Sequence, residues 1–136
     1  MKYRTSLKKY WRVIFVVLSI FVLVIMLQSS NAGVRLGQQN FQLETATTSE
    51  QKQKGLSNRD YLDKNTGMIF ESGDDEEMCM WMKNMKFDIA MIWVLDGRIE
   101  YIEPDVSMNS YPEIYCHRAD YVIELNVDDF ARSGLK

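Results

Sequence analysis

Seven consecutive apolar residues, Ile89 to Leu95, constrain the fold most strongly. A half-exposed strand alternates apolar and polar residues, so an uninterrupted apolar run of this length indicates a more deeply buried strand. Asp96-Gly97 follows at once, and this dipeptide is typical of a two-residue hairpin turn of type I′. Residues 98–103 then alternate again, which predicts the returning strand.

The remaining pattern predicts short strands separated by two short helices. Thr48 and Gln51 have the spacing of a helix capping box, and Gly55 is placed to end that helix. Asp128 is predicted to cap a second helix that ends at Gly134. The other predicted strands are 41–46, 68–70, 78–83 and 121–126. We therefore expect an α+β fold that is mainly antiparallel β, a small barrel-like or sandwich-like domain.

The first 30 residues differ in character from the rest of the chain. Five basic residues precede an apolar stretch from Val13 to Leu27, which indicates a secretory signal or a membrane anchor. The stretch is long for a signal core and shorter than the ~20 residues that span a bilayer comfortably, so both interpretations stay open. We expect an N-terminal apolar helix in which residues 13–30 contact the cell membrane, with a single pass and an extracytoplasmic C-terminal domain. Cleavage after Ala32 would instead release a secreted protein.

Residues 31–40 are predicted to be a linker, and residues 41–136 the folded domain. All 19 acidic residues follow Gly33, whereas five of the 16 basic residues precede it, so the part from Gly33 onward has a formal charge of −8. Such a charge disfavours nucleic acid as a partner, because phosphate backbones bind basic surfaces. The acidic run from Glu71 to Glu77 is predicted to be a solvated loop, an interpretation favoured over a calcium site.

Cys79 and Cys116 both lie in the part expected to be exported. In an oxidising compartment an even number of cysteines favours a disulfide bond, and two cysteines allow one intramolecular pairing. Two reduced, half-buried thiols are the alternative.

Six segments occur in an order that carries further information: Phe41–Glu44, Gly55–Arg59, Gly67–Phe70, Trp81–Phe87, Asp96–Ile99 and Tyr121–Leu125. In this order they resemble DUF192 (UPF0127), a family of small prokaryotic, often exported proteins, over about residues 41–136. The resemblance implies a compact β-rich fold and export, with ligand binding as an expectation and no settled enzymatic activity. One departure is Ala90, which stands where the family usually has aspartate, with an acid displaced to Asp88.

Trp81, Lys83 and Asn84 are the predicted ligand-binding residues. An indole ring beside ammonium and carboxamide donors would suit a glycan or a peptide, since the aromatic ring supplies area and the polar groups fix orientation. Tyr111 and Tyr115, on the loop after residue 104, are predicted to close over the same ligand. In the alternative interpretation Trp81 fills the core, Asn84 forms a turn and Lys83 is solvated.

The function that the sequence predicts is non-catalytic binding of a glycan, a peptide or an envelope protein, with no cofactor and no bound metal. A second hypothesis is a Cu(I) site built from Met78, Met80 and Met82, since thioethers are soft ligands, although methionine also fills irregular cores. An uncharacterised enzyme is a third, and it would need Asp88 or His117 in a cleft.

Overall fold

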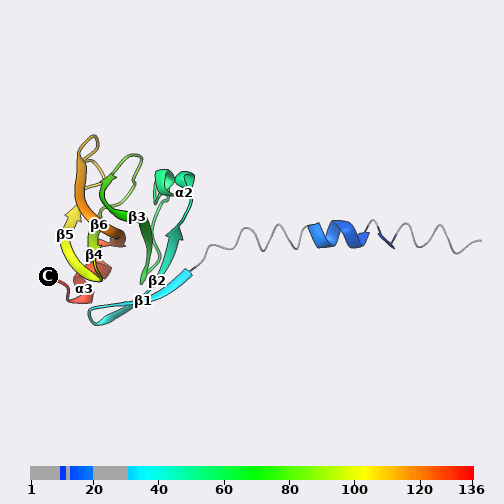
Figure 1. Cartoon of the computed structure of the whole chain (residues 1–136), viewed down its shortest axis with the longest axis horizontal. Coiled ribbons are helices and arrows are strands. Elements are labelled where there is room, and N and C mark those ends of the chain that lie inside the picture. Colours follow the sequence, from blue (N-terminus) through cyan, green and yellow to red (C-terminus); the bar gives the residue numbers. More distant parts are fainter. Residues whose placement is uncertain (1–9, 12, 20–30) are drawn as a thin grey trace, which may run out of the picture.

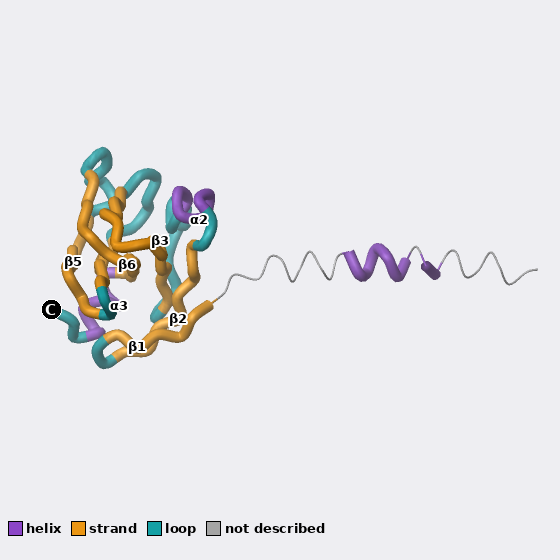
Figure 2. The backbone as a smooth tube through the Cα atoms, in the orientation of Figure 1, coloured by secondary structure: helices purple, strands orange, loops and turns teal. Residues whose placement is uncertain are grey.

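The computed structural model describes residues 10–11, 13–19 and 31–136. Residues 31–136 form one strongly curved six-stranded sheet in the order β1-β2-β3-β6-β4-β5 (Figures 1 and 2). Its elements are β1 (Asn31–Leu36), β2 (Gln39–Ala46), α2 (Ser49–Lys54), β3 (Thr66–Trp81), β4 (Ile89–Leu95), β5 (Arg98–Val106), β6 (Ile114–Asn126) and α3 (Val127–Ser133). Neighbouring strands are antiparallel except β2 and β3, which run parallel. The predicted α+β, mainly antiparallel class is confirmed.

The apolar run is strand β4, which lies between β5 and β6. Alternate residues face opposite sides of a sheet, and both sides of β4 are buried. The following turn has φ of +51° at Asp96 and +69° at Gly97, the two positive values that a type I′ hairpin requires. The predicted hairpin is therefore confirmed.

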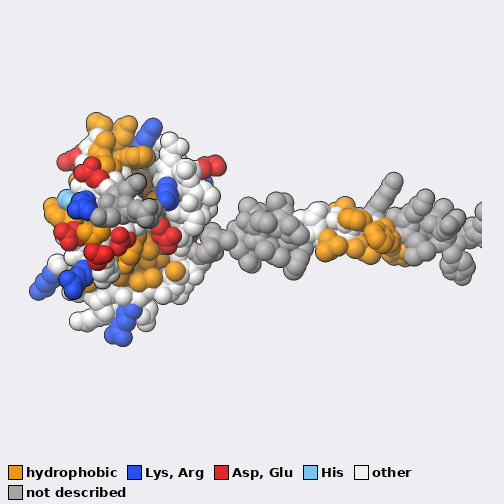
Figure 3. Space-filling model, viewed as in Figure 1, with side chains coloured by type: hydrophobic (Ala, Val, Ile, Leu, Met, Phe, Trp, Pro, Cys, Tyr) orange, Lys and Arg blue, Asp and Glu red, His pale blue; other side chains and the backbone are white. Residues whose placement is uncertain are grey.

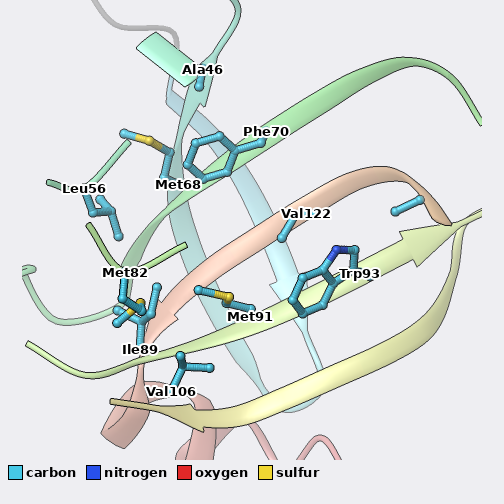
Figure 4. Packing of buried hydrophobic residues seen from close by; sticks show 11 residues of the cluster. Ala46, Leu56, Met68, Phe70, Met82, Ile89, Met91, Trp93, Val106 and Val122 are labelled. Atoms are coloured by element: carbon cyan, nitrogen blue, oxygen red, sulfur yellow. The ribbon is translucent and has the colours of Figure 1, made fainter. Parts of the chain in front are cut away.

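Two hydrophobic cores lie on the two faces of the sheet. One face contributes Met91 and Trp93 of β4 and Val122 of β6, which point into a shared interior with Phe70 (Figure 4). The other face contributes residues of β2, β4 and β6 and is covered by Phe130 of α3. In Figure 1, α2 and α3 lie at opposite ends of the sheet.

Residues 31–40, predicted as a linker, form a β-hairpin instead. β1 pairs with β2 from Asn31 opposite Glu44 to Leu36 opposite Gln39. Val34 and Leu36 pack against the core that α3 covers, and burial of these two side chains gives the hairpin its stability.

The acidic stretch from Glu71 to Glu77, predicted as a loop, is part of β3. Pairing with β6 shifts register between Glu71 and Glu76, which marks a bulge, and then resumes with Glu76 opposite Ala119. Backbone pairing with the long β6 therefore extends β3 through a sequence that local propensity disfavours as strand. The strand ends at Trp81, and Met82 beyond it is buried.

Helix α2 begins as predicted, since the Thr48 hydroxyl accepts the Gln51 N–H at 3.1 Å and Gln51 Oε1 accepts the Thr48 N–H at 2.9 Å. The cap of α3 differs from the prediction. The Asn126 carboxamide oxygen accepts the N–H of Asp128 at 3.0 Å, so Asn126 is the N-cap. Gly134, with φ of +75°, ends this helix as expected.

Residues 10–11 and 13–19 are helical and exposed. The rest of the predicted membrane segment, 1–9, 12 and 20–30, lies outside the described residues. Within the described ranges no helix is both long and apolar enough to cross a membrane.

A disulfide bond joins Cys79 to Cys116, which stand opposite each other in β3 and β6. The predicted pairing is confirmed.

Replacing both residues by alanine should lower the free energy of unfolding by up to about 4 kcal/mol, because the bond restricts the unfolded chain over a separation of 37 residues. Urea unfolding of the double variant against the oxidised wild type measures this, and equal midpoints would contradict it.

Gly67 is predicted to be intolerant of a side chain. An added Cβ would lie 2.5 Å from the Glu124 carbonyl oxygen and 2.8 Å from the Leu43 side chain. Gly67→Ala should therefore destabilise by roughly 3 kcal/mol, since overpacked cores must shift backbone or rotamers. Gly33→Ala is the matched control, because its Cβ would meet only Gln42 at 3.5 Å. Urea unfolding should separate the two variants, and similar losses would refute the steric argument.

Candidate functional site

A pocket of about 630 Å³ opens between α2 and the second half of β3. One wall is the polar surface of α2, and the opposite wall is apolar and comes mainly from β3. The apolar lining residues are Leu56, Phe70, Met78, Met80, Trp81 and Met85, and those of α2 are Ser49, Glu50, Lys52, Gln53 and Lys54. The pocket is thus an apolar recess with charged groups at its rim.

Two loops are tied together beside the pocket. The Ser57 hydroxyl donates to the carbonyl of Lys83 at 2.8 Å, and the N–H of Asn58 donates to the carbonyl of Asn84 at 2.8 Å. The first loop follows α2 and the second follows β3. These bonds hold the two walls at a fixed separation on this side.

Glu124 of β6 lines the same pocket and is 4 % exposed. Of the described residues around the pocket, it is the one whose polar side chain is buried. Burial raises the pKa of its carboxyl group from 4.5 to about 8, while the positive charge of Arg59 acts in the opposite direction. At neutral pH Glu124 is therefore mostly protonated, and it presents a neutral hydrogen-bonding group to the pocket.

The Arg59 guanidinium forms a two-pronged ion pair with Glu44, with distances of 2.6 Å and 2.8 Å. The hydrogen bond from Arg59 lowers the pKa of Glu44, and the same bond raises the pKa of Arg59. Both residues line a smaller pocket of about 170 Å³. The positive charge of Arg59, which would favour an ionised Glu124, is thus already paired with the Glu44 carboxylate. This pairing is consistent with the neutral form of Glu124.

The structure brings one of the five predicted ligand-binding residues to the pocket. Trp81 lines it with 38 % of its surface exposed. Lys83 is exposed outside the lining, and Asn84 adopts φ of +58° in the turn that follows β3. Tyr111 is exposed, whereas Tyr115 packs against the core and donates its hydroxyl proton to Glu113 at 3.0 Å. Ligand contact by these residues stays a prediction.

The residues of the other two hypotheses are dispersed. Met82 is 1 % exposed in the core, so the sulfurs of Met78, Met80 and Met82 do not share an open face as the Cu(I) hypothesis needs. Asp88 accepts the N–H of Met108 at 2.7 Å, a loop-fixing role. The His117 ring stacks on Tyr101 with centroids 3.7 Å apart, and neither Asp88 nor His117 lines a described pocket.

Sequence reasoning missed Glu124, although a signal was present. In Tyr121 to Leu125 it is the single charged residue of an otherwise apolar strand. Strand alternation places it on the same face as Val122, and that face is core. A carboxyl group in such a position is either paired with a cation or protonated. Either state makes the residue a candidate for a functional site.

A family model supplies the relationship of the chain to known proteins. It matches residues 32–136 and describes DUF192, an uncharacterized ACR. The chain belongs to the DUF192 family. The match includes β1, so the family domain begins about nine residues earlier than residue 41, the predicted start. No functionally curated protein is significantly similar to the chain.

Two solved structures share the fold of this DUF192 protein. One is a protein of Sinorhizobium meliloti 1021 provisionally named a transcription regulator, with 27 % identity and a TM-score of 0.74 over 81 % of this chain and 91 % of that one. The other is a protein of unknown function from Novosphingobium aromaticivorans DSM 12444. It has 27 % identity and a TM-score of 0.66 over 78 % of this chain and 77 % of that one.

The raised pKa of Glu124 predicts a pH-dependent stability. Between pH 4.5 and about 8 the folded state holds a proton that the unfolded state releases, so the free energy of unfolding should fall as pH rises through this window. Glu124→Gln lacks this loss and should become the more stable protein, by on the order of 3 to 5 kcal/mol at pH 8.

Urea unfolding at pH 5, 6, 7 and 8 measures the effect, with Glu100→Gln as the control because that carboxylate is exposed. Parallel profiles for wild type and Glu124→Gln would refute the assignment of a neutral Glu124.

Proposed function

We propose that this DUF192 protein is a non-catalytic binding protein of the cell envelope that captures an apolar group of a peptide, a protein or another envelope ligand in the pocket beside Trp81. The observation that supports this most is the recess of about 630 Å³ that is lined by an indole ring and by a buried, neutral carboxyl group. An apolar cavity with a few convergent polar groups is the usual form of a ligand site.

The lining favours an apolar side chain over a sugar. Met78, Met80 and Met85 supply flexible, polarizable surface that adapts to apolar groups of varied shape. A sugar would need several fixed hydrogen-bond donors around its hydroxyl groups, whereas the charged residues here lie on exposed α2 at the rim. Among the ligands expected from sequence, peptides and proteins therefore fit this pocket better than glycans.

The proposed location has two supports. The N-terminal basic and apolar segment has the composition of an export signal or anchor. The Cys79–Cys116 disulfide agrees with an oxidising compartment. We propose that the segment tethers the domain to the membrane or is removed after export.

Nucleic acid is a poorer candidate, although one structural relative is provisionally named a transcription regulator. The part from Gly33 onward carries a formal charge of −8. On the face in Figure 3, acidic and basic side chains alternate with hydrophobic patches, and no continuous basic surface is visible among the described residues. Phosphate contacts need such a surface.

The test uses 1-anilinonaphthalene-8-sulfonate, whose rings match the apolar wall and whose sulfonate can face the α2 lysines. Trp81→Ala should weaken its binding at least about tenfold, since the loss of aromatic contact amounts to roughly 1.4 kcal/mol. Tyr61→Ala is the control, because Tyr61 is 72 % exposed and lies outside the pocket lining. Fluorescence titration measures both variants.

Equal affinity in both variants would contradict the proposed pocket. A Trp81→Ala variant that fails to fold would instead identify Trp81 as a core residue, and that outcome would remove it from the site.

A further inference from the structure

The two halves of β3 differ in how their edges are used. From Gly67 to Phe70 the strand pairs with β2 on one edge and with β6 on the other. β2 ends at Ala46, where the chain turns into α2. From Glu76 to Trp81 the strand pairs with β6 alone, and no strand among the described residues pairs with its second edge. Four of the five β3 residues that line the pocket, Met78 to Trp81, belong to the half without a second partner.

The pocket lies along this edge rather than on one face of the strand. Met78, Cys79, Met80 and Trp81 are consecutive, and all four line it. Because neighbouring side chains of a strand point to opposite faces, a pocket on one face would touch alternate residues only. A ligand in the pocket would therefore meet the backbone of β3 as well as its side chains.

Alternate backbone groups of this half-strand face its unpaired edge. The Cα atoms of Cys79 and Cys116 are 4.1 Å apart, close to the ≈ 4.5 Å of a non-hydrogen-bonded pair and far from the ≈ 5.5 Å of a hydrogen-bonded pair. The N–H and C=O of Cys79 therefore face away from β6, and by alternation so do those of Glu77 and Trp81. In the described part of the chain, no loop or side-chain group hydrogen-bonds to the backbone of Cys79 or Trp81.

Resting on the proposed function, we infer that the ligand is an extended peptide segment of another protein, which binds by adding a strand to the edge of β3 at Glu77, Cys79 and Trp81. An unpaired edge is a template for strand addition, and main-chain hydrogen bonds then supply the affinity while side-chain pockets supply the specificity. The peptide takes the place beside β3 that β2 would occupy if it continued past Ala46.

The side-chain lining defines the chemistry of the peptide. One apolar side chain enters the recess formed by Met78, Met80 and Phe70, where the neutral Glu124 admits an uncharged group. The opposite wall carries Lys52 and Lys54 against the single carboxylate of Glu50, so a neutral or acidic side chain is favoured over a basic one at this wall.

The test selects binders from a random linear octapeptide phage library on the full-length protein and then scans one selected synthetic peptide by N-methylation. In strand addition, successive N–H groups of the peptide alternate between β3 and solvent. Methylation should therefore weaken binding about tenfold or more at alternate positions and less than twofold at the positions between them. An even effect along the peptide would overturn strand addition.

A matched pair of variants tests the protein side. Cys79→Ala/Cys116→Ala and Cys79→Pro/Cys116→Ala both lack the disulfide, and they differ in the Cys79 N–H. Proline is tolerated where that N–H faces away from the ladder, so both variants should fold equally well. The proline variant should bind the selected peptide about tenfold more weakly than the alanine variant does. Equal peptide affinity in the two variants would overturn the inference.

Failure of this inference and failure of the proposed function give different results. If the dye binds in a Trp81-dependent manner but the library yields no peptide that Trp81→Ala weakens, the pocket stands and strand addition is overturned. If neither the dye nor any peptide depends on Trp81, both are overturned. Self-association through this edge, lost in the proline variant, would overturn the assignment of a foreign peptide as the occupant.

Discussion

Burial of β4 on both faces is the constraint on which the rest of the structure depends. A strand without a polar face is stable only if apolar material covers it on two sides. The α3 side is covered by a helix and by the β1–β2 hairpin, whose residues form one core with Ile92 and Val94. The α2 side is covered by loops instead, through Leu56 and Met82. Loops cover a sheet less completely than a packed helix does, and the pocket lies where this second cover is incomplete.

Glu124 places a polar group in the core on the α2 side of the sheet. Its neighbours Ile123 and Leu125 belong to the core that α3 covers, while Glu124 faces the core beneath the pocket. A carboxyl group there loses its hydration, and Arg59, whose positive charge favours the ionised form, is already bound to Glu44. In this position, protonating the carboxyl group costs less free energy than burying it as an unpaired charge. The pocket consequently presents an uncharged carboxyl group at neutral pH.

The difference in length between β2 and β3 connects the pocket with the proposed mode of binding. β3 continues along β6 well beyond the point where β2 stops at Ala46, so the sheet has a step at this position. The Cys79–Cys116 disulfide holds the overhanging half of β3 to β6. A covalently held, half-paired strand offers a rigid template, and rigidity lowers the entropic cost of ordering a flexible peptide on it.

The sequence by itself determined the elements whose signals are local. The β4 run, the Asp96-Gly97 turn and the Thr48 capping box depend on neighbouring residues only, and they appear where predicted. Family membership followed from ordered motifs in the same way. Only the tertiary structure decided that residues 31–36 and 71–77 are strand. Residues 31–36 pair with the neighbouring β2 and pack Val34 and Leu36 on the core, and residues 71–77 belong to a strand that pairs with the distant β6, in both cases against weak local propensity. It also decided which residues share the pocket: Trp81 was predicted as a ligand-binding residue, but its place in one pocket with α2 and Glu124 depends on long-range packing that no local pattern encodes.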